Sequence, residues 1–213
     1  MNCLEWAPWE YGLILAAGSA DGKIYIFNRM ADDSWTHNSV QAHNGGINAL
    51  SWGPSTEPSI LSQEHQSAHI DNQQFALPPK RLVSAGNDCK IIVWHLKEHL
   101  ERVKDDFEHE HQDWVRDVAW ANNIGLTHET IASCSEDNKV KIWRNTNPAN
   151  PKEWQMVKEV NLGVPAWKVS WSLVGNMLAV SGGDNQVQIL KENSSGDWEV
   201  VSKVNEEGEL QDL

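Results

Sequence analysis

Apolar and polar residues alternate along this chain in a hairpin pattern that recurs four times. In one copy, residues 133–143 (SCSEDNKVKIW), a small-polar run is followed by an Asp-Asn pair and then by alternating Lys and apolar residues that end in a tryptophan. This order predicts two antiparallel strands joined by a tight turn. The third, fifth and sixth residues after the turn aspartate are apolar in every copy, and these aspartates are Asp21, Asp88, Asp137 and Asp184. Internal repetition of this kind predicts an all-β repeat architecture.

Each hairpin is flanked by two further strands, which gives units of four strands. The strand before the hairpin ends in a tryptophan, namely Trp6, Trp52, Trp120 or Trp171, and a short alternating segment follows the hairpin. We therefore expect one domain over 1–204, divided into units at about 1–42, 43–108, 109–162 and 163–204. The Ser-, Gln-, His- and Pro-rich insertion at 54–80 is expected to be disordered, and the acidic tail at 205–213 is expected to fray.

Charge and cysteine content exclude several classes of partner. The formal net charge of -13 would repel a phosphate backbone, so we expect no direct nucleic-acid binding. No apolar run approaches the roughly 20 residues of a spanning helix, and the start of the sequence has no basic segment before an apolar one. The 3 cysteines have no metal-ligand spacing, which favours reduced thiols in the cytosol or nucleus.

Two of the four units carry a set of polar residues and a tryptophan at fixed spacing. This set resembles that of the WD-repeat propeller family, in which each unit is a four-stranded blade. The family joins a His before the first strand, a Ser or Thr in the second, the turn Asp and the closing Trp in a buried hydrogen-bond network. The corresponding residues here are His43, Ser84, Asp88 and Trp94 in the second unit, and His111, Ser133, Asp137 and Trp143 in the third. The first and fourth units lack the set, so packing is expected to hold them.

The same residue types permit chemical interpretations, which the repetition disfavours. His43, Ser84 and Asp88 are the types of a hydrolase triad, but the chain has no Gly-x-Ser-x-Gly elbow, and a duplicated triad with a fixed tryptophan favours a structural network. The histidines at 95, 99, 109 and 111 lie close in sequence without the spacing of a zinc site. We therefore expect no catalytic, cofactor-binding or metal-ligating residues and no enzyme activity.

Longer strings point to a particular family. Residues 6–12 (WAPWEYG), 113–120 (DWVRDVAW), 170–176 (SWSLVGN) and 181–185 (SGGDN) resemble the Sec-thirteen family, the WD-repeat propeller of the COPII outer coat and the nuclear-pore Y-complex. That family builds a six-bladed propeller that stays open, so that a partner can insert a blade. The present sequence matches its last four blades. The resemblance implies an all-β, open WD-repeat propeller of which four blades are present, stable only when its open flanks are covered.

The resemblance also implies partners and a place in the cell. The partner would be a helical-solenoid coat or nucleoporin subunit that supplies the inserted blade, giving a hetero-oligomer without direct membrane insertion. The expected places are the cytoplasmic face of the ER membrane, COPII vesicles of ER-to-Golgi transport, and the nuclear pore complex. The alternative is a WD-repeat peptide-binding adaptor, such as a ubiquitin-ligase substrate receptor. Trp9, Trp114 and Trp167 lie at predicted strand ends, where they either face a partner or cap the core between blades.

Overall fold

The computed structural model describes residues 1–55, 79–105, 107–122, 126–147, 150–205 and 207–208, together with the backbone of 210–212. These residues form four antiparallel sheets, called blades A to D, each with strands in sequence order. Blade A holds β1 (Cys3–Trp6), β2 (Ile14–Gly18), β3 (Lys23–Arg29) and β4 (Trp35–Gln41), with a short 3-10 helix η1 (Trp9–Tyr11) after β1. Blade B holds β5 (Ile47–Trp52), β6 (Lys80–Gly86), β7 (Ile91–Leu96) and β8 (Leu100–Lys104).

The third and fourth blades follow the same plan. Blade C holds β9 (Val115–Trp120), β10 (Glu129–Ser135), β11 (Lys139–Asn145) and β12 (Gln155–Asn161). Blade D holds β13 (Ala166–Trp171), β14 (Met177–Gly182), β15 (Val187–Glu192) and β16 (Trp198–Val204), with a fifth strand β17 (Leu210–Asp212). In the described part of the chain, no helix has the length and hydropathy that a bilayer crossing requires.

The repeated aspartate explains why the second and third strands of each blade turn so tightly. Its carboxylate accepts the backbone N–H two residues further on, at 3.0 to 3.3 Å in blades A to D. The residue after the aspartate has a left-handed backbone, with φ of 80° at Gly22, 66° at Cys89, 67° at Asn138 and 59° at Asn185. Asp, Asn and Gly favour such turns because a short polar side chain can replace a backbone partner and because Gly and Asn tolerate positive φ.

The sheets pack face to face through three apolar clusters, one for each pair of neighbouring blades. One cluster joins blades A and B, another joins B and C, and the last joins C and D. Successive residues of a strand point to opposite faces, so an inner strand such as β5 contributes Leu50 and Trp52 to the first cluster and Ala49 to the second. The alternation seen in the sequence therefore buries both faces of the blades that have a neighbour on each side.

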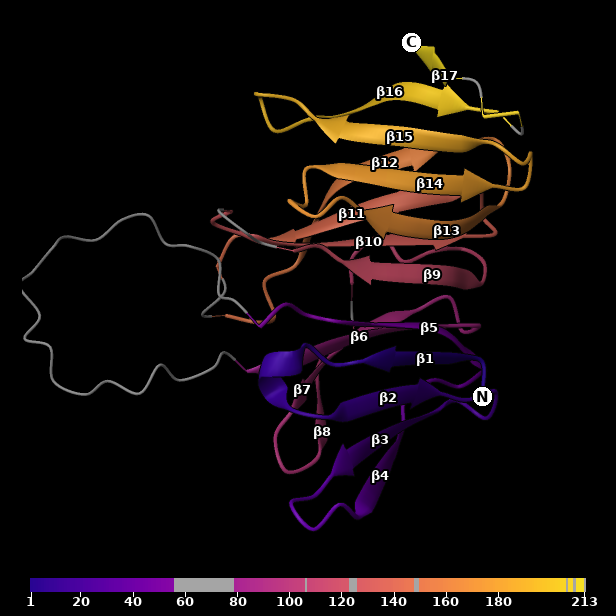
Figure 1. Ribbon diagram of the computed structural model, residues 1–213. Helices are drawn as coiled ribbons and strands as arrows, with labels where there is room; N and C mark the ends of the chain where they lie inside the picture. Colours follow the sequence, from indigo (N-terminus) through magenta and orange to yellow (C-terminus); the bar gives the residue numbers. More distant parts are fainter. Residues whose placement is uncertain are drawn as a thin grey trace, which may run out of the picture.

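The four blades form an open arc around their inner strands. In Figure 1, β1, β5, β9 and β13 lie side by side in the middle, with β1 packed on β5, β5 on β9 and β9 on β13. Blade A runs downward from this row and blade D runs upward, so the first and last blades point in opposite directions. The predicted fold class, an open WD-repeat β-propeller with four blades, is confirmed.

Two expectations about irregular segments have different outcomes. The insertion predicted at 54–80 lies outside the described residues, except for the first two and last two positions. The acidic tail at 205–213 was expected to fray, but its residues 210–212 form β17, which pairs antiparallel with β16. Main-chain hydrogen bonds to the outer edge of blade D account for this difference, because an edge strand offers unpaired donors and acceptors to any extended segment nearby.

Candidate functional site

The polar residues predicted in blade B meet in one chain of hydrogen bonds. His43 Nδ1 lies 2.7 Å from Asp88 Oδ1, and His43 Nε2 lies 2.7 Å from Ser84 Oγ. The indole Nε1–H of Trp94 donates to the same Ser84 Oγ at 2.9 Å. The backbone N–H of Asn44 donates to Asp88 at 3.0 Å. The network thus ties the loop before β5 to the β6–β7 hairpin.

Blade C repeats this network with the same four residue types. His111 Nδ1 lies 2.9 Å from Asp137 Oδ2, and its Nε2 lies 2.8 Å from Ser133 Oγ, which accepts the Trp143 indole N–H at 3.0 Å. The backbone N–H of Gln112 donates to Asp137 at 2.9 Å. The structure therefore brings together all four predicted residues in each of the two blades.

The charges within the blade C network follow from its geometry. Burial lowers the pKa of His111, with the Asp137 carboxylate acting against this, so the imidazole is neutral. Burial of Asp137 would raise its pKa, but hydrogen bonds from His111 and the Gln112 N–H outweigh this and lower the pKa to about 2. A neutral imidazole donates from Nδ1 to the carboxylate and accepts the serine hydroxyl at Nε2, which leaves every group in the network with a partner.

These networks have the connectivity of a hydrolase triad but not its accessibility. Ser84 and Ser133 are 0% exposed, and each serine oxygen already accepts an indole N–H. A serine nucleophile must reach its substrate, with oxyanion donors beside it. The arrangement therefore stabilises the blades, and catalysis by either serine would require opening the core.

The clustered histidines separate in the fold. His95 lies on β7, His99 lies in the β7–β8 turn, and His109 lies in the connection before β9, whereas His111 belongs to the blade C network. Among the residues that the structure describes, no three His, Cys, Asp or Glu side chains lie close enough together to hold a metal ion.

A tryptophan at the end of the inner strand links neighbouring blades. Trp52 Nε1–H donates to the main-chain oxygen of Glu5 at 3.1 Å, and Trp171 Nε1–H donates to that of Ala119 at 3.0 Å. In both cases the acceptor is the residue directly before the corresponding tryptophan of the preceding blade. Trp52 and Trp171 thus point back toward the blade before them, whereas the buried Nε1 of Trp120 has no hydrogen-bond partner among the described residues.

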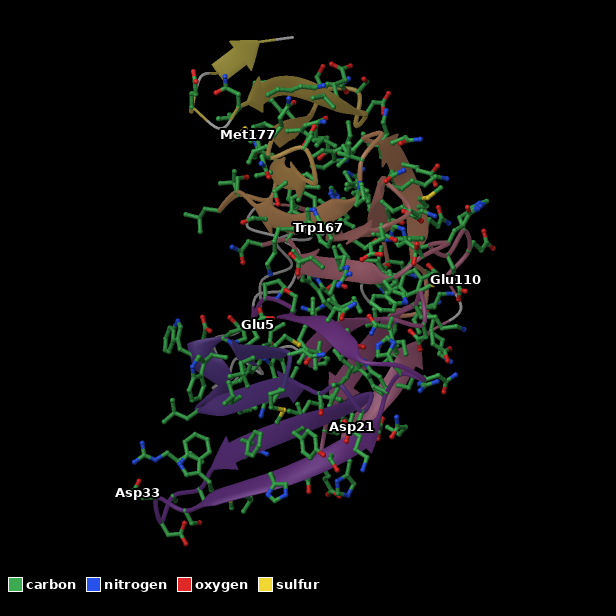
Figure 2. All side chains as sticks on the ribbon, turned by 90° about the vertical axis from the view of Figure 1, so that its right-hand side faces the viewer. Glu5, Asp21, Asp33, Glu110, Trp167 and Met177 are labelled. Atoms are coloured by element: carbon green, nitrogen blue, oxygen red, sulfur yellow. The ribbon has the colours of Figure 1, made fainter. Side chains whose placement is uncertain are left out.

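A side-chain acceptor on β1, β5 and β9 forms the second half of this junction. Glu5, Ser51 and Asp117 accept the backbone N–H groups of Trp52, Trp120 and Val169, at 3.3, 3.0 and 3.0 Å. Burial raises the pKa of Glu5 to about 7, against the opposing effect of the Trp52 N–H. Figure 2 places Glu5 near the middle of the arc, away from Asp33 at the tip of blade A. Each blade therefore offers acceptors to the blade that follows it.

The outer face of blade A has no neighbouring sheet, but it carries the inner-strand tryptophan that would take part in such a junction. Trp6, the counterpart of Trp52 and Trp120, is 56% exposed, whereas those two are 5% and 7% exposed. Trp35 is 49% exposed and its ring centroid lies 6.3 Å from that of Trp6. We call this face, with Leu4, Trp6, Leu15, Phe27 and Trp35, flank A.

The outer face of blade D also has no neighbouring sheet, and it carries the acceptor position of the junction. Ser170 holds in β13 the place that Ala119 holds in β9, and its side chain is exposed. Met177, Val187 and Ile189 form a partly exposed apolar surface beside it. We call this face flank D. Figure 2 shows Met177 on blade D and Asp33 on blade A at opposite ends of the arc.

The three candidate partner-facing tryptophans do not form one surface. Trp114 and Trp167 lie on either side of Arg116, whose guanidinium carbon is 5.1 and 5.0 Å from the two ring centroids. Glu136 pairs with Arg116. Trp9 lies instead in η1, which follows the far end of β1, and is 84% exposed. Whether any of the three faces a partner stays a prediction.

Sequence reasoning missed two ion pairs that cross between blades. Arg81 on β6 pairs with Glu129 on β10, and Arg144 on β11 pairs with Glu192 on β15. Arg81 also lies over the Trp120 ring, with its guanidinium carbon 5.6 Å from the ring centroid. The available signal was a charged residue within a predicted strand, because such a residue needs a partner when the strand is buried.

The comparisons with known proteins agree with this geometry. A family model described as "WD domain, G-beta repeat" matches residues 104–144. "Protein transport protein sec13" of Aspergillus fumigatus is 38% identical over 215 residues, covering 97% of this chain and 64% of that protein. "Protein transport protein SEC13" of Cryptococcus neoformans var. neoformans is 39% identical over 212 residues, covering 95% and 62%. "Protein SEC13 homolog" of Drosophila melanogaster is 37% identical over 201 residues, covering 93% and 54%.

The chain therefore spans less than two thirds of the length of these relatives. Its WD repeat, its four blades and this similarity along nearly its whole length lead to one conclusion: the chain belongs to the Sec-thirteen family of WD-repeat propellers.

Proposed function

We propose that this chain is a non-enzymatic scaffold in protein transport, which binds a helical-solenoid partner by accepting a blade from it. The observation that supports this best is the pair of unfilled junction halves on flanks A and D. A blade added to flank A would offer a carbonyl to the Trp6 indole. A blade added to flank D would bring its own indole to the carbonyl of Ser170, as Trp171 does for Ala119.

The setting of this assembly is proposed from the relatives. Their names describe protein transport, and the family resemblance directs the proposal to the COPII coat of ER-to-Golgi vesicles and to the nuclear-pore Y-complex. In both places the propeller would stiffen a solenoid rod at the membrane without touching lipid. The net charge of -13 supports the absence of lipid contact, since an acidic protein is repelled by anionic membrane surfaces.

Co-expression with the solenoid subunit tests the proposal. We expect recovery of a stoichiometric complex, and strong loss of that complex when the flank that receives the blade carries a buried charge. Trp6→Glu tests flank A and Ile189→Asp tests flank D. Val157→Glu is the matched control, because it adds the same charge at an exposed apolar residue of β12 in blade C, outside both flanks.

Three results would contradict the proposal. They are undiminished recovery of both flank variants, recovery of the chain with a ubiquitin ligase in place of the solenoid subunit, and a wild-type chain that melts alone at the same temperature as in the complex. The last result would mean that the open flanks need no cover. Large exposed apolar patches normally mark interaction surfaces.

A peptide-binding adaptor is the second candidate, and the Trp114–Arg116–Trp167 cluster favours it. An arginine over two half-exposed indoles brings aromatic surface and polar groups together at one site. Figure 2 places Trp167 near the middle of the arc, where the inner strands begin. Screening a peptide array with wild type and Trp167→Ala separates the two functions, because the scaffold requires no peptide signal that depends on Trp167.

A further inference from the structure

A cavity opens at the outer rim of the molecule between blades A and B. Its volume is about 260 Å³. Its walls are Ile24, Ile26 and Val40 of blade A and Leu96 and Leu100 of blade B, with His99 at the β7–β8 turn. All five apolar residues belong to or pack against the core between the two blades, so the cavity is continuous with that interface.

The pairing of the third and fourth strands shows which residue of each other blade corresponds to Leu100. The residue opposite the end of the third strand is Trp198 in blade D, where it faces Glu192, and Trp35 in blade A, where it faces Arg29. In blade C the pairing of Arg144 with Gln155 brings Trp154, the preceding residue, to the same place. In blade B, Leu96 faces Leu100. Blade B thus has a leucine where the other three blades have a tryptophan.

Trp154 and Trp198 show what a tryptophan does at this position. They are 7% and 1% exposed, and each packs edge-on against the inner-strand tryptophan of its own blade, with ring centroids 5.4 Å apart. Trp198 shares a cluster with Val140 and Ile142 of the preceding blade, which are the counterparts of Ile24 and Ile26. The blade A wall of the cavity, with Ile24 and Ile26, therefore corresponds to the blade C wall beside the Trp198 indole.

Size and polarity limit what the cavity holds. Its volume falls below the roughly 300 Å³ at which pockets for whole small molecules begin, so a single side chain suits it better. The walls are mainly aliphatic, which suits an aromatic ring, while His99 and Asn38 supply polar atoms for an indole N–H or a peptide group. The chain's net charge of -13 favours neutral or basic residues beside that ring.

We propose that this cavity binds a Trp or Phe side chain of an extended, neutral or basic segment of a partner protein. The ring completes the junction of blades A and B as Trp154 and Trp198 complete the next two. The segment runs beside β4, the edge strand of its sheet, whose outer main-chain groups are placed for strand addition. This site is separate from both flanks, so it serves a second contact beyond the added blade.

Methyl NMR of the full chain tests the site, with the solenoid partner bound if the chain is not monodisperse alone. The probes are N-acetyl-tryptophanamide and a capped hexapeptide with one Trp and two Lys. We expect saturable shifts of the methyl groups of Ile24, Ile26, Leu96 and Leu100 with both probes. The hexapeptide in which Ala replaces Trp should lose at least tenfold in affinity.

Filling the cavity from within the chain supplies the matched variants. Leu100→Trp restores the residue of the other blades and should abolish the shifts while raising the melting temperature. Val40→Phe fills the cavity from the opposite wall and replaces Leu100→Trp if that variant does not fold. Absence of methyl shifts in wild type, shifts that persist in the filled variant, or equal affinity for the Ala-containing hexapeptide would each overturn the proposal.

Discussion

Blades B and C differ from blades A and D in both their polar networks and their surroundings. Blades B and C each have a His–Ser–Asp–Trp network and a neighbouring blade on both faces. Blades A and D lack the network and have a neighbouring blade on one face only. All four nevertheless form the same hairpin around the same aspartate turn. The turn and the apolar columns are therefore sufficient for a blade to form, and the network adds stability to a blade already enclosed.

The comparison also separates two uses of one residue type. In blades B and C, the inner-strand tryptophans and the tryptophans of the networks lie in clusters shared by two sheets. Trp6 and Trp35 of blade A instead contact each other, with tilted rings, at a surface. Duplication has copied the residue, but only a neighbouring sheet converts it into core. An exposed copy of a core residue therefore marks a place where a sheet is expected.

The largest effect should come from removing the indole at the centre of a network. Trp143→Ala deletes a side chain that is 1% exposed, and we expect it to lower the free energy of unfolding by about 3–5 kcal/mol. Its counterpart Phe27→Ala, at a half-exposed position of blade A, should cost about 1–2 kcal/mol because less apolar area leaves the core. Urea unfolding of both variants measures the difference, and equal losses would contradict the contrast between inner and outer blades.

The next effect concerns the network's hydroxyl. Ser84→Ala leaves His43 Nε2 and the Trp94 indole without a partner in the core, which should cost about 1–3 kcal/mol. Combining it with Trp94→Phe should cost less than the sum of the two single changes, because both remove the same hydrogen bond. A stability unchanged by Ser84→Ala, together with loss of a hydrolytic activity, would favour the rejected catalytic interpretation.

Much of this structure could be predicted from particular residues. The columns after Asp21, Asp88, Asp137 and Asp184 predicted the hairpins, and the fixed spacing of His111, Ser133, Asp137 and Trp143 predicted a network that forms within one blade. These features are local: strand register and turn geometry set them within about 30 residues. The WD-repeat fold class follows from their repetition.

Contacts between blades were harder to predict, because they depend on how whole sheets are stacked. Nothing in the sequence places Trp114 and Trp167 around Arg116 or sends Trp9 to the far end of β1. The pairing of Arg81 with Glu129 likewise joins strands of two sheets. Leu100, which lines the cavity, corresponds to Trp154 and Trp198 only through the strand register, which the sequence does not reveal.

A smaller effect should appear as pH dependence at the junction of blades A and B. The pKa of Glu5 rises from 4.5 in the unfolded chain to about 7 in the folded one, mainly through burial, so the folded chain binds this proton more tightly. The resulting stability is fully present below pH 4.5 and is lost as pH rises through 7, by about 1–2 kcal/mol after allowance for partial exposure. Glu5→Gln should be flatter than wild type between pH 4.5 and 7.5.

Thermal melts across that range provide the measurement for Glu5. The control is Glu10→Gln, a carboxyl in η1 away from the junction, which should keep the wild-type slope. If Glu5→Gln keeps that slope as well, the proton is held elsewhere, and burial between blades A and B is not its cause.

The smallest effect on stability should come from changing Trp6. Comparing that effect with the effect on the complex shows whether flank A binds a partner or is ordinary surface. In the chain alone, Trp6→Ser should change the free energy of unfolding by no more than about 0.5 kcal/mol, since the side chain is largely exposed. Trp120→Ser, at the equivalent buried position, should cost about 3–5 kcal/mol. If a blade covers flank A in the assembled complex, Trp6→Ser should weaken that complex severalfold. An unchanged complex would leave flank D as the only flank that receives a blade.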